Sequence, residues 1–272
     1  MDKNLYIHPH EEFFLKEMME NTLFSEEILD YYKNFDEKLR RPDLLGKTVK
    51  VSEKQFKEVY HIIKEIANEL DMLMPNAYIY EDFYYGVESK GVYDPWIEIS
   101  AKTLLDFSKE ELNFLISREM CNIKLKHTHH NTLIEETLKA MNHNNIIIGM
   151  DTLTQGLKIT MYRYSRTANY TSDCFGYIIC KDIKVCVKSI LKLILNNVYL
   201  AENINIQEYM SQAEAINELD DKIYNFTKGD ELVPYGPFRI KNLLAYASSA
   251  RGLEAVKIHL EKHCNKLNEG GV

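Results

Sequence analysis

The residues best suited to chemistry lie between positions 111 and 127, where Arg118, Glu119 and Asn122 share one predicted helix. An H-E-x-x-H helix places two His one turn apart as zinc ligands, and the Glu beside the first His is the general base. Here Arg118 and Asn122 stand at the two His positions, while Glu119 keeps the position of the base. Because arginine has no lone pair to donate, the stretch predicts the frame of a zinc helix without its ligands.

Capping boxes predict where the two main N-terminal helices begin. Ser52 and Gln55 form one box, so a helix is expected to start at Glu53. Ser108 and Glu111 form a second box, which starts the helix that carries the polar residues described above. Each box is followed by apolar residues at helical spacing, which indicates that one face of each helix is buried.

Short aromatic and β-branched runs at 77–80 and 96–100, with a glycine-containing segment between them, predict two or three antiparallel strands. The later part of the chain has helical periodicity instead. We therefore expect an α+β fold that is mostly α, with one small antiparallel sheet. The later helices are predicted at 151–179, 183–199, 206–219, 238–250 and 253–267.

Pro42 and Gly46 interrupt the helical periodicity near the N-terminus, and we place a boundary there. Residues 1–42 are predicted to form a helical N-terminal appendage, and residues 43–272 the main domain. The appendage has helical patterns at 11–20 and 26–37, and its aromatic residues Phe13, Phe14, Tyr31 and Tyr32 are interpreted as core, with an arm that docks on another protein as the alternative.

Composition narrows the classes of partner. The chain is 45% hydrophobic, and its apolar runs are far shorter than the roughly 20 residues that cross a membrane, so no span is expected. The first residues lack the features of a secretory signal, which predicts a cytoplasmic location. A net charge of −8 with scattered Lys and Arg argues against nucleic acid. The five cysteines lack C-x-x-C spacing and are predicted to be free thiols.

In the order and spacing of these pieces, from about Leu44 to Tyr246, the chain resembles the HtpX and CAAX-prenyl-protease family of gluzincin zinc metallopeptidases, and most of all its soluble branch. The first active helix of the family reads H-E-L-x-H-x-x-x-x-H, and the last His position here is His127. The resemblance implies a metallopeptidase (zincin-like) fold in which two active-site helices cross, with residues 43–272 as the metallopeptidase-like domain.

The second active helix of the family reads S-R-x-x-E-x-x-x-D-x-x-G, which corresponds here to the stretch 165–176. The third zinc ligand, Glu, is replaced by Asn169, while the Asp and Gly positions are kept as Asp173 and Gly176. A later His-Pro segment that leads into an Arg-initiated helix corresponds to Tyr235-Gly-Pro-Phe-Arg239, so its His is Tyr235. All three ligands are therefore replaced, and the resemblance implies no metal and no other cofactor.

The altered site has a predicted arrangement of its own. In the family, the residue at the position of Asp173 orients a zinc-bound His. We expect the guanidinium of Arg118 to fill the vacated metal position and to pair with Glu119 or Asp173, while Asn122 and Asn169 complete the hydrogen bonds. Arg239 is counted among the binding residues through its match to the family's Arg-initiated helix.

The function implied is that of a pseudoprotease, which binds a peptide or protein partner along its former substrate groove. Peptidases of this clan bind substrate as an added strand, which uses main-chain hydrogen bonds and does not require the metal. The resemblance places the edge strand at 96–100, with Trp96 and Ile97 as binding residues. The segment 81–93 is a loop that could lie across the groove.

The alternative is an active peptidase or other hydrolase, with Glu119 as the general base, Tyr235 as the oxyanion donor and Cys121 as a nucleophile. Cys121 is turned about 200° from Glu119 around the helix, so it is also readily explained as a small core residue. His127, His129 and His130 are interpreted as cations near a helix C-terminus, with an atypical metal site as the alternative. Drift after loss of activity and a purely structural subunit remain open.

Overall fold

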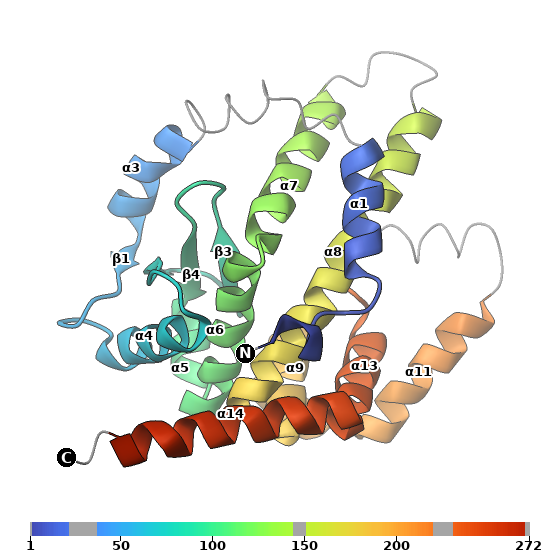
Figure 1. Ribbon diagram of the computed structural model, residues 1–272. Helices are drawn as coiled ribbons and strands as arrows, with labels where there is room; N and C mark the ends of the chain where they lie inside the picture. Colours follow the sequence, from blue (N-terminus) through green and yellow to red (C-terminus); the bar gives the residue numbers. More distant parts are fainter. Residues whose placement is uncertain (1, 22–36, 144–150, 220–230, 270–272) are drawn as a thin grey trace.

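The computed structural model describes residues 2–21, 37–143, 151–219 and 231–269, and there the chain is mostly helical around one small sheet (Figure 1). No helix in these ranges is long and apolar enough to cross a membrane. The helices are η1 (a 3-10 helix, Lys3–Leu5), α1 (Glu11–Asn21), α3 (Glu37–Lys47), α4 (Lys57–Leu70), α5 (Ala101–Asp106), α6 (Lys109–Lys124), α7 (His127–His143), α8 (Asp151–Cys180), α9 (Ile183–Leu195), α10 (Val198–Glu202), α11 (Ile206–Glu218), α13 (Gly236–Ser248) and α14 (Ala250–Glu269).

The sheet has four strands in the order β1-β2-β4-β3, and it is mixed. Strand β4 (Trp96–Ser100) runs parallel to β2 (Asn76–Tyr80), whereas β1 (Val49–Lys50) and β3 (Val87–Lys90) run antiparallel to their neighbours. The predicted antiparallel sheet is therefore wrong for its central pair. The chain passes from β2 to the far edge, forms β3, and returns as β4, which gives β4 the direction of β2.

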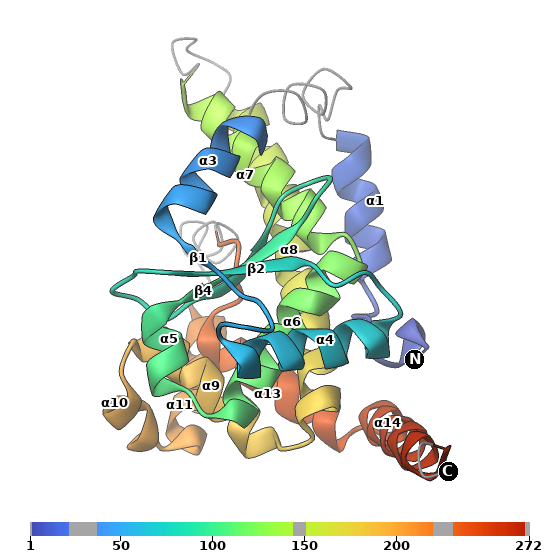
Figure 2. The ribbon, with the colours of Figure 1, turned by 90° about the vertical axis from the view of Figure 1, so that its left-hand side faces the viewer.

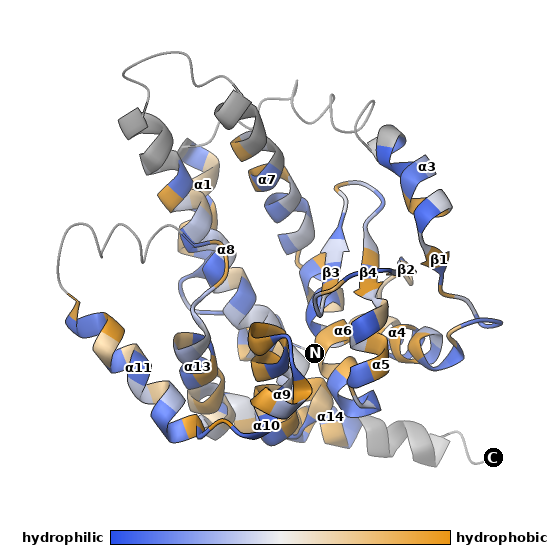
Figure 3. Ribbon diagram, turned by 180° about the vertical axis from the view of Figure 1, so that it is seen from behind, coloured by the Kyte–Doolittle hydropathy of each residue, from blue (hydrophilic) through white to orange (hydrophobic). Residues whose placement is uncertain are grey.

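The two faces of the sheet are covered differently (Figure 2). Ala77, Ile79, Ile97 and Ile99 point to one face, where they belong to the main core together with residues of α4 and α6. The other face lies toward α3. Side chains alternate along a strand, so each strand of this sheet contributes to both faces. Hydrophobic residues are concentrated on α4, α6 and α9 around this core (Figure 3).

Helix α6, which carries the predicted site, begins as expected. The Ser108 hydroxyl accepts a hydrogen bond from the Glu111 backbone N–H at 3.3 Å, and the Glu111 carboxylate accepts one from the Ser108 backbone N–H at 2.8 Å. The other predicted box is wrong, because α4 begins only at Lys57. Ser52 and Gln55 instead bond to each other through their backbones, and Phe56 adopts a left-handed conformation with φ of 55° at the N-cap.

The later helices mostly match their predicted ranges. The predicted helix at 183–199 is two helices, because Asn196 takes a left-handed conformation after α9 and Asn197 caps α10. The predicted break at Pro42 and Gly46 is wrong, because α3 runs through both residues. The proposed boundary at residue 42 thus falls inside a helix.

The N-terminal segment packs against α8 (Figure 1). Met18 of α1 is fully buried in a second core cluster, and Phe14 packs against this cluster. Phe13 is 65% exposed, so its interpretation as core is wrong. Tyr31, Tyr32 and most of the predicted helix at 26–37 lie outside the described residues.

Gly176 allows α6 and α8 to approach closely beneath the predicted site. A Cβ atom at this position would lie 2.8 Å from the Phe114 ring and 2.9 Å from Cγ of Arg118. Real Cβ atoms essentially never make contacts this short. Glycine is therefore required here by packing against α6, although it is a poor helix former.

We predict that Gly176→Ala destabilises the protein by about 1–3 kcal/mol, because the overpacked crossing outweighs the gain in helix propensity. Gly156→Ala, on the same helix, is the matched control, since its Cβ would meet nothing within 4 Å. That control is expected to be neutral or stabilising by up to about 1 kcal/mol. Urea unfolding measures both, and equal stability of the two variants would contradict the packing argument.

The C-terminal helix is held to α4 by a buried carboxylate. Oε1 of Glu69 lies 3.5 Å from Nδ1 of His259 and 3.0 Å from Nζ of Lys262, both on α14. Burial acts to raise the pKa of Glu69, but the contacts with His259 and Lys262 prevail and lower the pKa to about 2. Since the folded-state pKa is below the ordinary 4.5, the stability contributed by the ionised Glu69 is complete above pH 4.5 and is lost as the pH falls toward 2.

Glu69→Gln is therefore expected to lower the free energy of unfolding by about 1–3 kcal/mol at pH 7, because the buried His259 and the partly exposed Lys262 lose a charged acceptor. The deficit relative to the wild type should shrink as the pH drops below about 4.5, where the wild-type carboxylate itself becomes protonated. Glu65→Gln, an exposed position on the same helix, serves as the control. A deficit that stays constant from pH 7 to pH 3 would disprove the proposed role of the Glu69 charge.

Candidate functional site

The predicted polar residues meet where α6, α8 and α13 come together. Asp173 of α8 is fully buried and lies between two arginines. Nε of Arg118 donates to Oδ1 of Asp173 at 2.5 Å, which is the pairing predicted from the sequence. Arg239 of α13 donates to both carboxylate oxygens, from Nε to Oδ2 at 2.6 Å and from Nη2 to Oδ1 at 2.8 Å. Both arginines are 5% exposed, so this is a buried ionic centre.

The charges of this centre maintain one another. Burial acts to raise the pKa of Asp173, but the guanidinium groups of Arg239 and Arg118 overcome it and lower the pKa. Burial acts to lower the pKa of Arg239, but the charge of Asp173 outweighs this effect and raises the pKa. Removing one partner from such a buried pair leaves an uncompensated charge, which is far costlier than losing a surface ion pair.

Two further side chains complete the surroundings of Arg118. Nη2 of Arg118 donates to Oδ1 of Asn169 at 3.3 Å, as predicted, and Nη1 lies 3.7 Å from Oε1 of Glu119. Asn122, predicted to complete the hydrogen bonds of this cluster, bonds to Glu119 on the side away from Arg118. Its Nδ2 donates to Oε2 of Glu119 at 3.1 Å.

Glu119 connects the helices to the sheet. Its Oε2 accepts hydrogen bonds from the Ser89 backbone N–H at 2.9 Å, from the Ser89 hydroxyl at 2.8 Å and from Asn122. Ser89 lies on β3, the edge strand of the sheet. Its N–H therefore points away from β4, and Glu119 occupies the position that the carbonyl of an added strand would take. Ser89 is not predicted as a site residue from the sequence, because no local pattern marks a strand whose edge faces a helix.

A buried chain of hydrogen bonds continues from this site to the N-terminal segment. Oδ1 of Asn122 lies 3.1 Å from Nδ1 of His127, and Nε2 of His127 lies 2.8 Å from Oε1 of Glu11 on α1. Thr171 of α8 donates to the second oxygen of Glu11. Burial acts to raise the pKa of Glu11, but the contacts with His127 and Thr171 lower it. Residues of α1 are thus part of the same polar network as Glu119.

A cleft opens above this network. It has a volume of about 210 Å³ and lies between the edge strand β3 and helices α6, α7 and α8. Its walls are polar and carry both signs of charge. The cleft is lined by Arg40, Glu88, Ser89, Lys90, Glu119, Asn122, Asn131, Thr132, Glu135, Ser165, Asn169, Leu232 and Val233.

Other predicted site residues lie apart from this cleft. Ile97 is fully buried in the core, and Trp96 lies on the opposite face of the sheet, against α3. Strand β4 pairs with neighbours on both sides, so the prediction that it is the edge strand is wrong. The edge strands are β1 and β3, and β3 occupies part of the predicted loop 81–93. Tyr235 is the N-cap residue of α13 and does not line the cleft.

Cys121 and the histidines also differ from their predicted roles. Cys121 is fully buried in the core, and burial raises the pKa of its thiol well above the usual value, which opposes its use as a nucleophile. It is a free thiol, as are Cys174, Cys180 and Cys186, while the side chain of Cys264 lies outside the described residues. His127, His129 and His130 are not at a helix C-terminus, because α6 ends at Lys124 and they form the first turn of α7.

The donor set around Asp173 does not fit a zinc ion. Arg118 and Arg239 bring two permanent positive charges to its carboxylate, and neither can ligate a metal. Asn169 is occupied by Arg118 and by the backbone carbonyl of Ser165. Within the part of the chain that the structure describes, no group of three or more His, Cys, Asp or Glu is arranged to hold a metal ion.

Comparison with known proteins gives no relative: no protein-family model matches the chain, and no curated protein sequence matches it.

We predict that Asp173→Asn lowers the free energy of unfolding by about 3–5 kcal/mol, because two buried guanidinium groups lose their shared counter-charge. Asp43→Asn removes an exposed carboxylate paired with Lys47 and should cost no more than about 1 kcal/mol. Chemical denaturation of both variants tests this difference. If Asp173→Asn were as mild as Asp43→Asn, the buried ionic centre would not be an important source of stability.

Proposed function

We propose that the chain is a non-catalytic metallopeptidase homologue, similar to the HtpX and CAAX-prenyl-protease family, that binds an extended peptide in the cleft beside β3. The observation that carries this proposal is the edge N–H of Ser89, which faces the cleft and is held by the Glu119 carboxylate. A peptide added to this edge would bind through its main chain, which does not require a metal.

Three features of the structure support the relationship to the family. The two proposed active-site helices, α6 and α8, pack against each other through Gly176. The edge strand β3 runs antiparallel to its neighbour and lies next to α6. Arg118, at the position of the first His ligand, reaches Asp173 at the position of the family's orienting carboxylate. In this proposal the two arginines supply the positive charge that zinc provides in the active enzymes.

The state of Glu119 favours binding over hydrolysis. A general base must present a lone pair to the water that it activates. Three donors already engage Oε2 of Glu119, and Oε1 faces Nη1 of Arg118 at 3.7 Å. A peptide carbonyl can replace the Glu119 carboxylate as the acceptor for the Ser89 backbone N–H. The carboxylate then keeps its hydrogen bonds from the Ser89 hydroxyl and from Asn122.

The proposal can be tested with a mixture of random octapeptides, separated from the protein by rapid gel filtration and identified by mass spectrometry. Ser89→Ala and Ser89→Pro both remove the hydroxyl, but only the proline removes the edge N–H. We expect the wild type and Ser89→Ala to retain intact peptides, and Ser89→Pro to retain at least about tenfold less, because strand addition depends on main-chain hydrogen bonds. Proline is tolerated on an edge strand, and thermal melting verifies that each variant is folded.

Two outcomes would contradict the proposal. Equal retention by Ser89→Pro and Ser89→Ala would show that peptides do not add to β3. Shortened peptides that appear with the wild type and disappear with Glu119→Gln would instead establish the alternative, a hydrolase that uses Glu119 as its base.

A further inference from the structure

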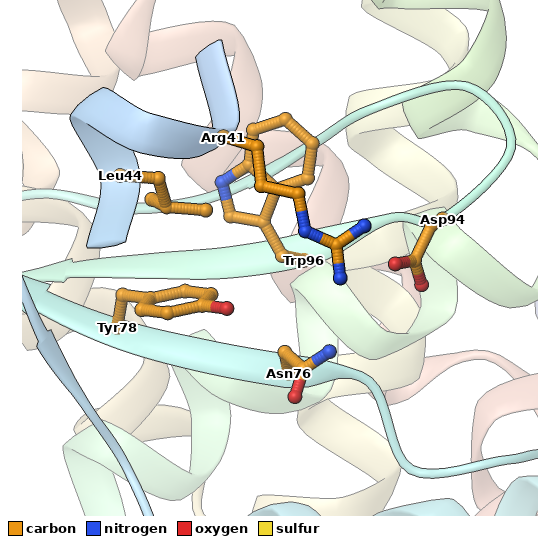
Figure 4. A pocket seen from close by; sticks show the side chains of 6 residues that line it. All are labelled: Arg41, Leu44, Asn76, Tyr78, Asp94 and Trp96. Atoms are coloured by element: carbon orange, nitrogen blue, oxygen red, sulfur yellow. The ribbon is translucent and has the colours of Figure 1, made fainter. Parts of the chain in front are cut away.

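The outer face of the sheet, which faces away from the main core, has a second pocket. Its floor is aromatic, with Tyr78 on β2 and Trp96 on β4 lying side by side beneath α3 (Figure 4). Leu44 and Arg41 reach down to it from α3, and Asp94 stands at its rim. These residues lie on the face that is not part of the main core, as strand alternation requires.

Arg41 occupies this site with its side chain. Its aliphatic part lies along the Trp96 ring, and its guanidinium points toward Asp94 and Asn76 (Figure 4). Burial raises the pKa of Tyr78, and the charges of Arg41 and Asp94 act on that pKa in opposite directions, which places both groups near its ring. An aromatic surface with a carboxylate at its rim is the arrangement that favours a guanidinium, which stacks on the ring and pairs with the carboxylate.

The helix that supplies Arg41 is held weakly. Along α3, Arg41, Asp43, Leu45 and Lys47 are exposed, and Leu44 is half-buried. A segment with few buried contacts opens at low cost in free energy. The Arg41 side chain can therefore leave the aromatic surface while the sheet beneath it remains folded.

The space around Arg41 indicates how a ligand would enter. Beside the guanidinium only about 30 Å³ is free, room for about two water molecules, so a second arginine side chain fits there only if Arg41 withdraws. Next to it lies an open groove of about 450 Å³ between α3 and the strands, wide enough for a peptide backbone. Tyr80, Glu81, Trp96 and Glu98 line the sheet side of this groove.

Glu98 and Lys90 organise the floor of the groove. Glu98 accepts hydrogen bonds from the Trp96 indole N–H at 2.7 Å and from Nζ of Lys90 at 2.9 Å. These contacts fix the orientation of the Trp96 ring, so its aromatic face is directed at the position of Arg41. The ring is thus preorganised for stacking before a ligand arrives.

We propose that this surface binds an arginine side chain of a partner protein or peptide, and that Arg41 is an internal competitor that occupies the site until the partner displaces it. Trp96 stacks on the incoming guanidinium, and Asp94 pairs with it. The backbone on either side of the arginine lies in the groove between α3 and β4. This inference concerns the outer face of the sheet and does not depend on the proposed metallopeptidase ancestry.

Trp96 is the single tryptophan of the chain, so its fluorescence reports on this site alone. The probe is the peptide acetyl-Gly-Arg-Gly-amide, and acetyl-Gly-citrulline-Gly-amide is its neutral counterpart of nearly the same shape. At constant ionic strength the arginine peptide should change the Trp96 emission saturably, and the citrulline peptide should not. Arg41→Gln should bind the arginine peptide about tenfold more tightly, because a tethered competitor acts at millimolar effective concentration.

Asp94→Asn should weaken binding of the arginine peptide about tenfold, because the guanidinium loses a charged partner. Glu254→Gln removes the same charge from an exposed position on α14 and should leave binding unchanged. Equal responses to the two peptides would overturn the proposal, as would an Arg41→Gln variant that binds no more tightly than the wild type. If the Asp94→Asn and Glu254→Gln variants bound the arginine peptide with the same affinity, net charge alone would account for the effect of Asp94→Asn. That result would also refute the proposal.

Discussion

The structure depends on one carboxylate shared by two arginines. Asp173 is fully buried, and Arg118 and Arg239 reach it from two other helices. One carboxylate cannot balance two guanidinium groups, so a second anion is needed close by. Glu119 supplies it, 3.7 Å from Arg118, and the centre is then electrically neutral. Three helices and the edge of the sheet are connected through this balance of charge, because Glu119 also holds Ser89 of β3.

This arrangement supports the proposal that the centre serves binding and not turnover. Catalytic groups need unsatisfied hydrogen-bonding capacity where charge develops during the reaction. Here the donors and acceptors of Asp173, Arg118, Glu119 and Asn122 are largely used within the protein. A satisfied polar network of this kind rigidifies the crossing of α6 and α8. It leaves the edge of β3 as the part of the centre that can exchange partners.

Local signals in the sequence predict the elements of this centre well, and its long-range contacts less well. The Ser108 and Glu111 capping box is a local motif, and the helix starts where it predicts. The failed box at Ser52 shows the limit of such signals, because the left-handed Phe56 delays the helix for reasons that depend on the surrounding fold. Alternation along β4 identifies its faces but not its neighbours, so a central strand was expected to be an edge.

Contacts between residues distant in the chain were predictable only where both residues lie in motifs that resemble those of the same family. The pairing of Arg118 with Asp173 was expected because both positions belong to matched helices, and the structure contains it. The contact between His127 and Glu11 joins residues 116 positions apart, and neither residue type indicates the other. The bidentate contact of Arg239 with Asp173 had no signal beyond the position of Arg239 near the start of a helix. Hydrogen bonding supplies the reason, because Arg118 donates only to Oδ1 of Asp173, and Arg239 provides the donor for the buried Oδ2.

Strand β3 connects the two surfaces to which we assign binding. Its side chains alternate, so Ser89 faces Glu119 and the cleft, whereas Lys90 bonds to Glu98 on the outer face and also borders the cleft. Glu98 in turn holds the Trp96 indole. A peptide that exchanges with Glu119 at Ser89 acts on a strand of only four residues, whose next residue helps to orient the aromatic floor on the other face. Because β3 is short and lies at the edge, its neighbouring residues Ser89 and Lys90 contribute to both of the surfaces that we propose for binding.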